Sequence, residues 1–192
     1  MKRTLLVLFA VWACGAASAD VPPSDTVATL TDLPIMGASR TSRERFVEHV
    51  SVKNPGIDRY YARRVFETYQ TECLNEGVDV VVALSQMIHE TDYLLFTGSV
   101  SSSQYNFAGI GATAPGEKGL SFPNLAVGVR AHVQHLKAYG SSDPLQADLV
   151  DPRFGYVTRG SAVSVNELAG RWATDPGYGP KVMAHVNRLI IP

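Results

Sequence analysis

Apolar residues recur at helical intervals in six stretches of the chain. In one of them Tyr61, Val65, Tyr69 and Cys73 lie four positions apart, and Gly77 follows as a C-terminal cap. We therefore expect helices over about 41–53, 57–75, 79–96, 124–140, 164–173 and 180–190. Because little of the remaining sequence alternates as a strand does, the pattern predicts a mainly α fold, α+β at most.

Two long irregular stretches separate the later helices. Residues 99–123 are rich in Ser, Gly and Pro, and residues 141–160 contain two Asp-Pro steps that indicate turns. Irregular segments of this length in a small domain are usually functional or disordered. Neither an internal repeat nor a heptad pattern accompanies them.

The N-terminal residues 1–19 have the pattern of a secretory signal peptide. Lys2 and Arg3 precede an apolar run, and the small residues Ala17-Ser18-Ala19 end it. The run is shorter than the roughly 20 residues that span a bilayer, so we expect no membrane span. The alternative is lipoprotein cleavage before Cys14, which would leave an acylated N-terminus. Both interpretations export the protein to the periplasm or the exterior.

Residues 20–40 mix Pro, Asp, Thr and Gly without a period, which predicts a linker or disordered tail before one domain over 41–192. Loss of the signal peptide would remove two of 17 basic residues and leave 15 against 18 acidic ones. This mildly negative balance excludes an electrostatic footprint for nucleic acid. It would also leave Cys73 as the single cysteine, so no internal disulfide is expected. We expect a monomer.

Glu90 stands out on the helix expected over 79–96. A helical wheel places it at the boundary of the apolar face, flanked by Ala83, Met87 and Leu94. Partial desolvation of a carboxyl raises its pKa, and a raised pKa lets a general acid keep its proton near neutral pH. The alternative is an ordinary boundary glutamate paired with a base elsewhere.

Three motifs follow one another around this residue. They are Ile88-His89-Glu90-Thr91, then Asn106-Phe107-Ala108-Gly109-Ile110-Gly111, and finally Arg171-Trp172-Ala173-Thr174-Asp175-Pro176-Gly177-Tyr178. Over about residues 60–191 the chain resembles the glucosaminidase family of peptidoglycan hydrolases, glycoside hydrolase family 73. One departure is Asp92, where family members commonly have Gly; the wheel points it away from Glu90.

The resemblance implies a lysozyme-like fold of about six helices, with a short or abbreviated β-hairpin region beside the cleft. It implies a catalytic domain over 41–192 that hydrolyses the β-1,4 bond between N-acetylglucosamine and N-acetylmuramic acid in peptidoglycan strands, with Glu90 as the acid. A muramidase or lytic transglycosylase is the alternative within the fold. The alternative from a different functional class is a non-catalytic envelope protein that binds glycan.

Glycoside hydrolysis usually needs a second group, and the sequence leaves its identity open. Glu117 lies where longer relatives carry a hairpin with an acidic residue, although a solvated turn residue is the simpler interpretation. Tyr178 matches the tyrosine of the family motif and is a supporting candidate. A nucleophilic acetamido oxygen of the substrate would make a second carboxylate unnecessary.

Sugar-binding candidates come from the middle and last motifs. Asn106 offers an amide donor and acceptor, Phe107 an aromatic face, and Gly109 a close backbone approach. Tyr105 is a weaker candidate, and Asp175 either contributes to this site or holds Tyr178 or the start of the last helix. Trp172 is expected in the core.

No metal or cofactor is expected. His132 and His135 are three apart on a helix, but no HExxH pattern or third ligand accompanies them. We expect both on a solvated helix face, and His89 on the surface.

Overall fold

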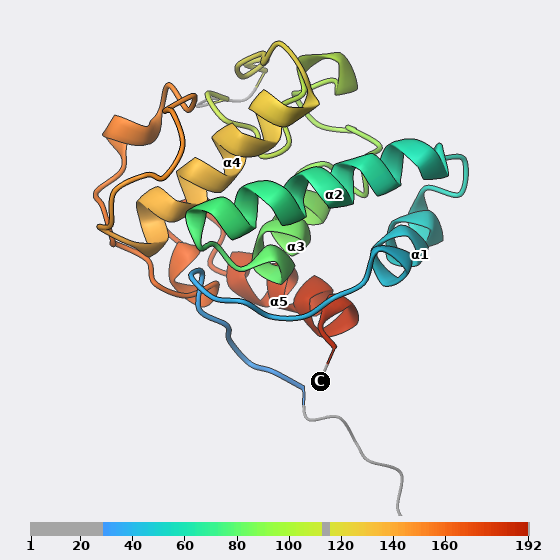
Figure 1. Ribbon diagram of the computed structural model, residues 1–192, viewed down its shortest axis with the longest axis horizontal. Helices are drawn as coiled ribbons and strands as arrows, with labels where there is room; N and C mark the ends of the chain where they lie inside the picture. Colours follow the sequence, from blue (N-terminus) through green and yellow to red (C-terminus); the bar gives the residue numbers. More distant parts are fainter. Residues whose placement is uncertain (1–28, 113–115, 192) are drawn as a thin grey trace, which may run out of the picture.

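The computed structural model describes residues 29–112 and 116–191. These contain five α-helices and three short 3₁₀ helices, and isolated bridges take the place of strands. In chain order the elements are α1 (Arg43–Lys53), α2 (Arg59–Glu76), α3 (Val80–Glu90), η1 (Ser102–Gln104), α4 (Leu125–Gly140), η2 (Phe154–Tyr156), η3 (Asn166–Leu168) and α5 (Tyr178–Leu189) (Figure 1). The prediction of a mainly α, lysozyme-like fold is confirmed.

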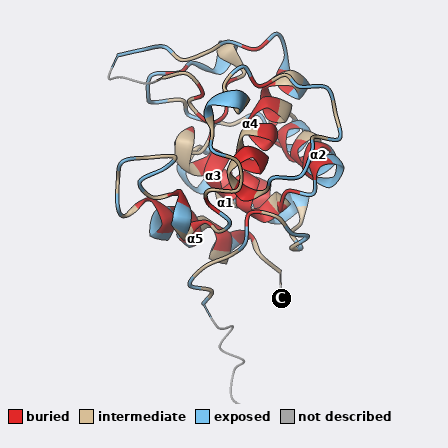
Figure 2. Ribbon diagram, turned by 90° about the vertical axis from the view of Figure 1, so that its left-hand side faces the viewer, coloured by how far each residue is buried: buried red, intermediate tan, exposed pale blue. Residues whose placement is uncertain are grey.

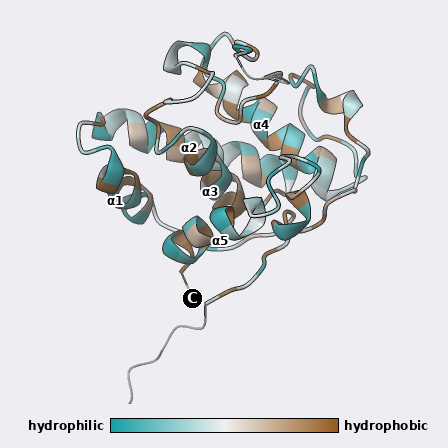
Figure 3. Ribbon diagram, turned by 180° about the vertical axis from the view of Figure 1, so that it is seen from behind, coloured by the Kyte–Doolittle hydropathy of each residue, from teal (hydrophilic) through white to brown (hydrophobic). Residues whose placement is uncertain are grey.

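The centre of the domain is α3, which is packed among α2, α4 and α5 (Figure 1). Every residue from Val81 to Ile88 is buried, so this helix has no solvent face over two turns (Figure 2). The helices around it alternate between hydrophilic and hydrophobic residues along the ribbon (Figure 3). A helix buried on all sides holds its side chains in fixed positions, and its C-terminal residue is therefore placed rigidly.

The expected third helix is wrong at its C-terminal end, because α3 stops at Glu90 rather than near Phe96. Asp92, Tyr93 and Leu94 have φ of 47°, 59° and 62°, in the left-handed region. For residues with a Cβ this conformation costs roughly 1–2 kcal/mol each. Two backbone hydrogen bonds offset part of that cost, from Tyr93 N to Ile88 O at 2.9 Å and from Phe96 N to Thr91 O at 2.8 Å.

The expected helix over 164–173 is also wrong, since only the single 3₁₀ turn η3 forms there. The chain then turns back at Gly170, whose N–H donates to Ala173 O at 2.7 Å and whose φ is 77°. The four remaining expected helices correspond to α1, α2, α4 and α5, and each begins and ends within two residues of its expected bounds.

Residues 29–40, expected as part of a linker, instead pack on the domain. Ile35 is fully buried. Its N–H donates to Val163 O at 2.9 Å, and its carbonyl accepts from Asp79 N at 2.8 Å. The domain thus begins before residue 41. The signal peptide, Cys14 and residues 20–28 lie outside the described residues.

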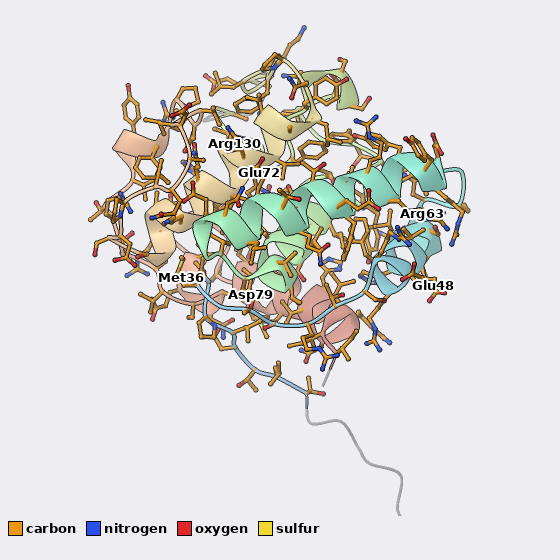
Figure 4. All side chains as sticks on the ribbon, viewed as in Figure 1. Met36, Glu48, Arg63, Glu72, Asp79 and Arg130 are labelled. Atoms are coloured by element: carbon orange, nitrogen blue, oxygen red, sulfur yellow. The ribbon has the colours of Figure 1, made fainter. Side chains whose placement is uncertain are left out.

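Two ion pairs join α4 to α2. Lys137 Nζ lies 2.8 Å from Glu76 Oε2, and both side chains are buried. Glu76 also accepts from the backbone N–H groups of Gln146 and Ala147, which fixes the start of the 141–160 connection. Arg130 pairs with Glu72 at 2.9 Å (Figure 4). α4 is thereby held against the centre of the domain.

Two further observations bear on the predictions. Cys73 is buried, and its thiol is free. No helix in the described part of the chain is long and apolar enough to cross a bilayer.

Candidate active site

Glu90 lies at the wall of a cleft of about 320 Å³. The described residues that line this cleft are Glu90, Gly98, Ser99, Val100, Ala108, Gly109, Ala112, Trp172 and Ala173. The cleft forms where α3 ends, between the loop that contains Gly109 and the turn after η3. Among these lining residues Glu90 is the one with a carboxyl group.

The two oxygens of the Glu90 carboxyl group have different surroundings. Oε1 accepts from Trp172 Nε1 at 2.9 Å and from the Tyr178 hydroxyl at 2.5 Å. Oε2 lies toward Gly109, where an added Cβ would be 3.9 Å from it. One oxygen is therefore anchored by two donors, while the other faces the loop that borders the cleft.

Burial raises the pKa of Glu90 above its usual value, and the hydrogen bonds from Tyr178 and Trp172 lower it by less. The net direction agrees with the expectation from the helical wheel. A carboxyl group of this kind holds a proton to higher pH than a solvated glutamate, which is what a general acid requires.

Both donors come from the segment that leads into α5. Trp172 follows η3, where its backbone N–H donates to Leu168 O at 2.8 Å. Its indole is enclosed by the rings of His132, His135 and Tyr139 at 5.0–5.8 Å. The indole therefore cannot rotate freely away from Glu90.

Asp175 fixes the start of α5. Its Oδ1 accepts from Gly177 N at 2.8 Å, and its Oδ2 lies 2.6 Å from Lys181 Nζ. Asp175 is not among the residues that line the cleft. Of the roles considered for it, the structure supports the one at the start of the last helix, and substrate binding is not supported.

Asn106 is not positioned to bind a sugar. It is fully buried. Its Nδ2 donates to Ile110 O and Leu120 O, both at 2.9 Å, and its Oδ1 accepts from Ile110 N at 3.0 Å. The amide is thus occupied by backbone groups, and it shapes the loop that carries Gly109. This arrangement supports a structural role, because a buried amide and a sugar-binding amide have the same sequence signal, and sugar binding by Asn106 stays a prediction.

Two aromatic candidates are also structural. Phe107 is fully buried and packs against the rings of Tyr69 and Phe96, at centroid distances of 6.2 and 6.0 Å. Tyr105 is half-buried against the core, and the cleft lining does not include it. Of the residues predicted to bind substrate, Gly109 alone borders the cleft beside Glu90.

Two acidic residues, Glu117 and Asp92, are not among the described residues that line the cleft. Glu117 is exposed and comes shortly after residues 113–115, which are outside the described part of the chain. Asp92 pairs with Lys53 at 3.3 Å and accepts from Thr97 at 3.1 Å. Asp92 therefore points away from Glu90, as expected.

Sequence reasoning missed three residues behind the site. Trp172 was expected in the core, yet it is half-buried and donates to Glu90. His132 was expected on a solvated face, yet it is fully buried, and burial lowers its pKa to about 3. Gln86, which was not singled out, donates to the Tyr178 hydroxyl at 2.7 Å. Its signal is its position one helical turn before Glu90.

The histidines of α4 do not share a metal. His132 points into the core, whereas His135 is half-buried and lies 2.7 Å from the buried Asp151. In the described ranges no group of three His, Cys, Asp or Glu side chains could hold a metal ion. His89 is half-buried, and its ring packs on that of Tyr178 at 5.4 Å.

Comparison with known proteins identifies the family of the chain. A family model described as Glucosaminidase, mannosyl-glycoprotein endo-beta-N-acetylglucosaminidase, matches residues 66–190, which include Glu90, Trp172 and Tyr178. A Borreliella burgdorferi protein, described as uncharacterized, is 43% identical over 156 residues, 81% of this chain and 76% of that protein. No solved structure matches the chain. Because the family model covers well over half of the sequence, the chain belongs to the glucosaminidase family, a family of glycoside hydrolases that act on peptidoglycan.

Proposed function

We propose that this protein is an exported endo-β-N-acetylglucosaminidase in which Glu90 is the general acid. The observation that supports this most directly is the Glu90 carboxyl group, which is desolvated at the wall of a cleft and anchored through one oxygen. The proposed bond is the β-1,4 linkage between N-acetylglucosamine and N-acetylmuramic acid. The substrate is therefore the glycan strand of peptidoglycan.

In this mechanism the proton is carried by Oε2, the oxygen on the Gly109 side, and passes to the glycosidic oxygen as the bond breaks. The negative charge that remains on Glu90 is stabilised at Oε1 by Trp172 and Tyr178. Charge-assisted hydrogen bonds of this kind strengthen as the acceptor becomes ionised. The two donors therefore stabilise the transition state more than the ground state, which accelerates the reaction.

The second group is either Glu117 or the substrate itself. Glu90 supplies the one carboxyl group in the described lining of the cleft, so a second carboxylate would have to be brought in by Glu117. An acetamido oxygen that attacks the anomeric carbon needs no such residue. Glu117→Gln separates the two: a loss of about 100-fold or more in kcat supports a carboxylate mechanism, and near-normal activity supports the acetamido oxygen.

Export is part of the proposal because the substrate lies outside the cytoplasm. Support comes from the signal-peptide pattern of residues 1–19 and from the peptidoglycan-directed family. Periplasmic and extracellular locations, and acylation at Cys14, are separated by fractionation of cells that express the wild type and Cys14→Ser.

The decisive experiment is digestion of purified peptidoglycan by the wild type and by Glu90→Gln, with mass spectrometry of the new chain ends. Reducing N-acetylglucosamine ends support the proposal. Reducing muramic acid ends would identify a muramidase, and anhydromuramic ends a lytic transglycosylase. Absence of cleavage by the wild type would favour a glycan-binding protein, and undiminished cleavage by Glu90→Gln would refute the role of Glu90.

A further inference from the structure

A continuous row of buried hydrogen bonds leads from Glu90 into the core. The Tyr178 hydroxyl lies 2.5 Å from Glu90 Oε1 and 2.7 Å from Gln86 Nε2. Gln86 Oε1 lies 2.8 Å from His132 Nε2, and His132 Nδ1 lies 2.7 Å from the Tyr69 hydroxyl. We call Tyr69, His132, Gln86 and Tyr178 the donor chain. Its members come from α2, α4, α3 and α5, and all four are buried.

The donor chain has a single direction when Glu90 is ionised. A carboxylate only accepts, so Tyr178 must donate to Glu90, and its oxygen then accepts from the Gln86 amide N–H. The Gln86 carbonyl consequently faces His132 and accepts from its Nε2–H. A fully buried His132 is neutral, so its Nδ1 accepts a hydrogen bond from the Tyr69 hydroxyl. Every hydrogen bond therefore donates toward Glu90.

Each member of the donor chain fixes the orientation or tautomer of the member that lies one step closer to Glu90. A glutamine amide that rotated by half a turn would present its carbonyl to Tyr178 and compete with Glu90 for the phenol proton. The Nε2–H of His132 prevents this, because the rotated amide would place an N–H against an N–H. The Tyr69 hydroxyl fixes the tautomer of His132 in turn. Hydrogen bonds in such a row also polarise one another.

We propose that Tyr69, His132 and Gln86 are positioning residues that keep the Tyr178 hydroxyl directed at Glu90 Oε1 throughout the reaction. This proposal rests on the proposed function of Glu90 as the general acid. Because the catalytic proton resides on Oε2, Oε1 accepts from Tyr178 both before and after proton transfer. The hydrogen bonds of the donor chain therefore keep the same direction throughout. None of its side chains has to reorient as charge develops on Glu90.

Among the groups around Glu90, the hydrogen-bond donors Tyr178 and Trp172 are the ones that lower its pKa. Burial raises the pKa of Glu90, and the hydrogen bonds from Tyr178 and Trp172 lower it; among the described residues no charged side chain is a cause of the shift. His89 precedes it on α3, and the pKa of His89 is lowered by burial. From α4, His132 and His135 lie behind the Trp172 indole. The Gly109 side of the cleft carries no titratable side chain among its described lining residues.

Disruption of the donor chain has a specific consequence. Donation to the ionised carboxylate lowers the pKa of Glu90, so a weaker donor lets that pKa rise. A general acid works in its protonated form, and the basic limb of the pH–kcat profile therefore moves to higher pH. At the same time kcat falls, because the carboxylate formed in the transition state is less stabilised. KM changes little, since Gln86, His132 and Tyr69 do not line the cleft.

The test compares two disruptive variants with two matched controls. Gln86→Met and His132→Met fill similar volumes without the required donors. His132→Gln restores a donor near the position of Nε2 and is the conservative rescue. Ser85→Ala is the neighbouring control, because the Ser85 hydroxyl is buried on α3 and has no hydrogen-bond partner among the described residues. Tyr69→Phe removes only the hydroxyl at the end of the donor chain farthest from Glu90. If the methionine variants fail to fold, this variant still tests the proposal.

We expect Gln86→Met and His132→Met to lower kcat about tenfold. We also expect the basic limb of the pH–kcat profile to move to higher pH by about 0.5–1 pH unit. Tyr69→Phe has a smaller effect in the same direction, His132→Gln lies near the wild type, and Ser85→Ala is unchanged. A merely structural role would lower kcat equally at all pH values and leave the limb in place, which would overturn the proposal.

A second readout does not depend on activity. In protein labelled with ¹³C at the glutamate carboxyl carbons, the Glu90 resonance is assigned by its loss in Glu90→Gln, and its pKa is followed by titration. The pKa should rise in Gln86→Met and Tyr69→Phe and stay constant in Ser85→Ala. A constant pKa in the first two variants refutes the donor chain. Full activity of Glu90→Gln would instead refute the proposed function alone, with the titration still deciding this inference.

Discussion

The Tyr178 hydroxyl donates to Glu90 Oε1 at 2.5 Å, although the two residues lie 88 positions apart in the chain. Tyr178 is the first residue of α5, and Glu90 is the last residue of α3. The interaction therefore depends on how these two helices pack together, and it defines which oxygen of Glu90 is anchored.

Tyr178→Phe removes this donor while it keeps the aromatic ring. We expect kcat to fall by about 10- to 100-fold and the basic limb of the pH profile to move upward, because the ionised form of Glu90 loses a hydrogen bond. Peptidoglycan digestion from pH 4 to 9 measures both effects. Tyr156→Phe, which alters an exposed tyrosine, is the control. An unchanged profile would contradict the supporting role of Tyr178.

Glu90→Gln should alter the pH dependence of stability. The pKa of Glu90 is raised in the folded protein, so its contribution to stability is fully present below the unfolded-state pKa of about 4.5 and is lost as pH rises through the folded pKa. The neutral glutamine carries no such loss. Thermal unfolding should therefore show the Tm of Glu90→Gln improving relative to the wild type between pH 4 and pH 8. A constant Tm difference across this range would mean that the pKa is not raised.

Gly109→Ala tests the close approach of the loop to the acid. Gly109 has a φ of 64°, and an added Cβ would lie 3.9 Å from Glu90 Oε2. We expect about 1 kcal/mol lower stability from the left-handed backbone, together with a lower kcat/KM from crowding beside the proton-carrying oxygen. Gly98→Ala is a matched control, because Gly98 also lines the cleft but has no atom within 4 Å of an added Cβ. Equal kinetics for both variants would exclude a special role for Gly109.

Asn106→Ala distinguishes a structural amide from a sugar-binding one. Loss of its four hydrogen bonds to the surrounding backbone should destabilise the fold by about 1–3 kcal/mol or more. Because the loop that carries Gly109 is also loosened, kcat should fall along with stability. Chemical denaturation and glycan digestion measure the two quantities. A rise in KM with unchanged stability would restore the sugar-binding interpretation.

Most of the fold could be predicted from the sequence, because apolar periodicity and capping residues are local signals. The end of α3 could not, since Asp92, Tyr93 and Leu94 adopt left-handed φ values that their residue types disfavour. Those conformations are held by tertiary packing around the helix end. The same reason applies to Ile35, whose burial against residues 79 and 163 depends on long-range contacts.

The candidate site was predicted in part. Glu90 and Tyr178 carry recognisable motif signals, and the structure brings them together. Asn106 and Phe107 are buried in the loop and the core, and the sequence could not indicate this because an amide and an aromatic ring are as common there as in a sugar-binding site. The roles of Gln86 and His132 could not be predicted, because they depend on hydrogen-bond partners 92 and 46 positions away, which no local pattern indicates.

The separation of Glu90 from its donors has a consequence for biosynthesis. The donors Trp172 and Tyr178 are synthesised 82 and 88 residues after Glu90. A nascent chain therefore contains Glu90 before the two groups that donate to its carboxyl group have been made. Under the proposed function, activity is expected only when α5 has docked on α3, that is, from the fully synthesised and folded domain.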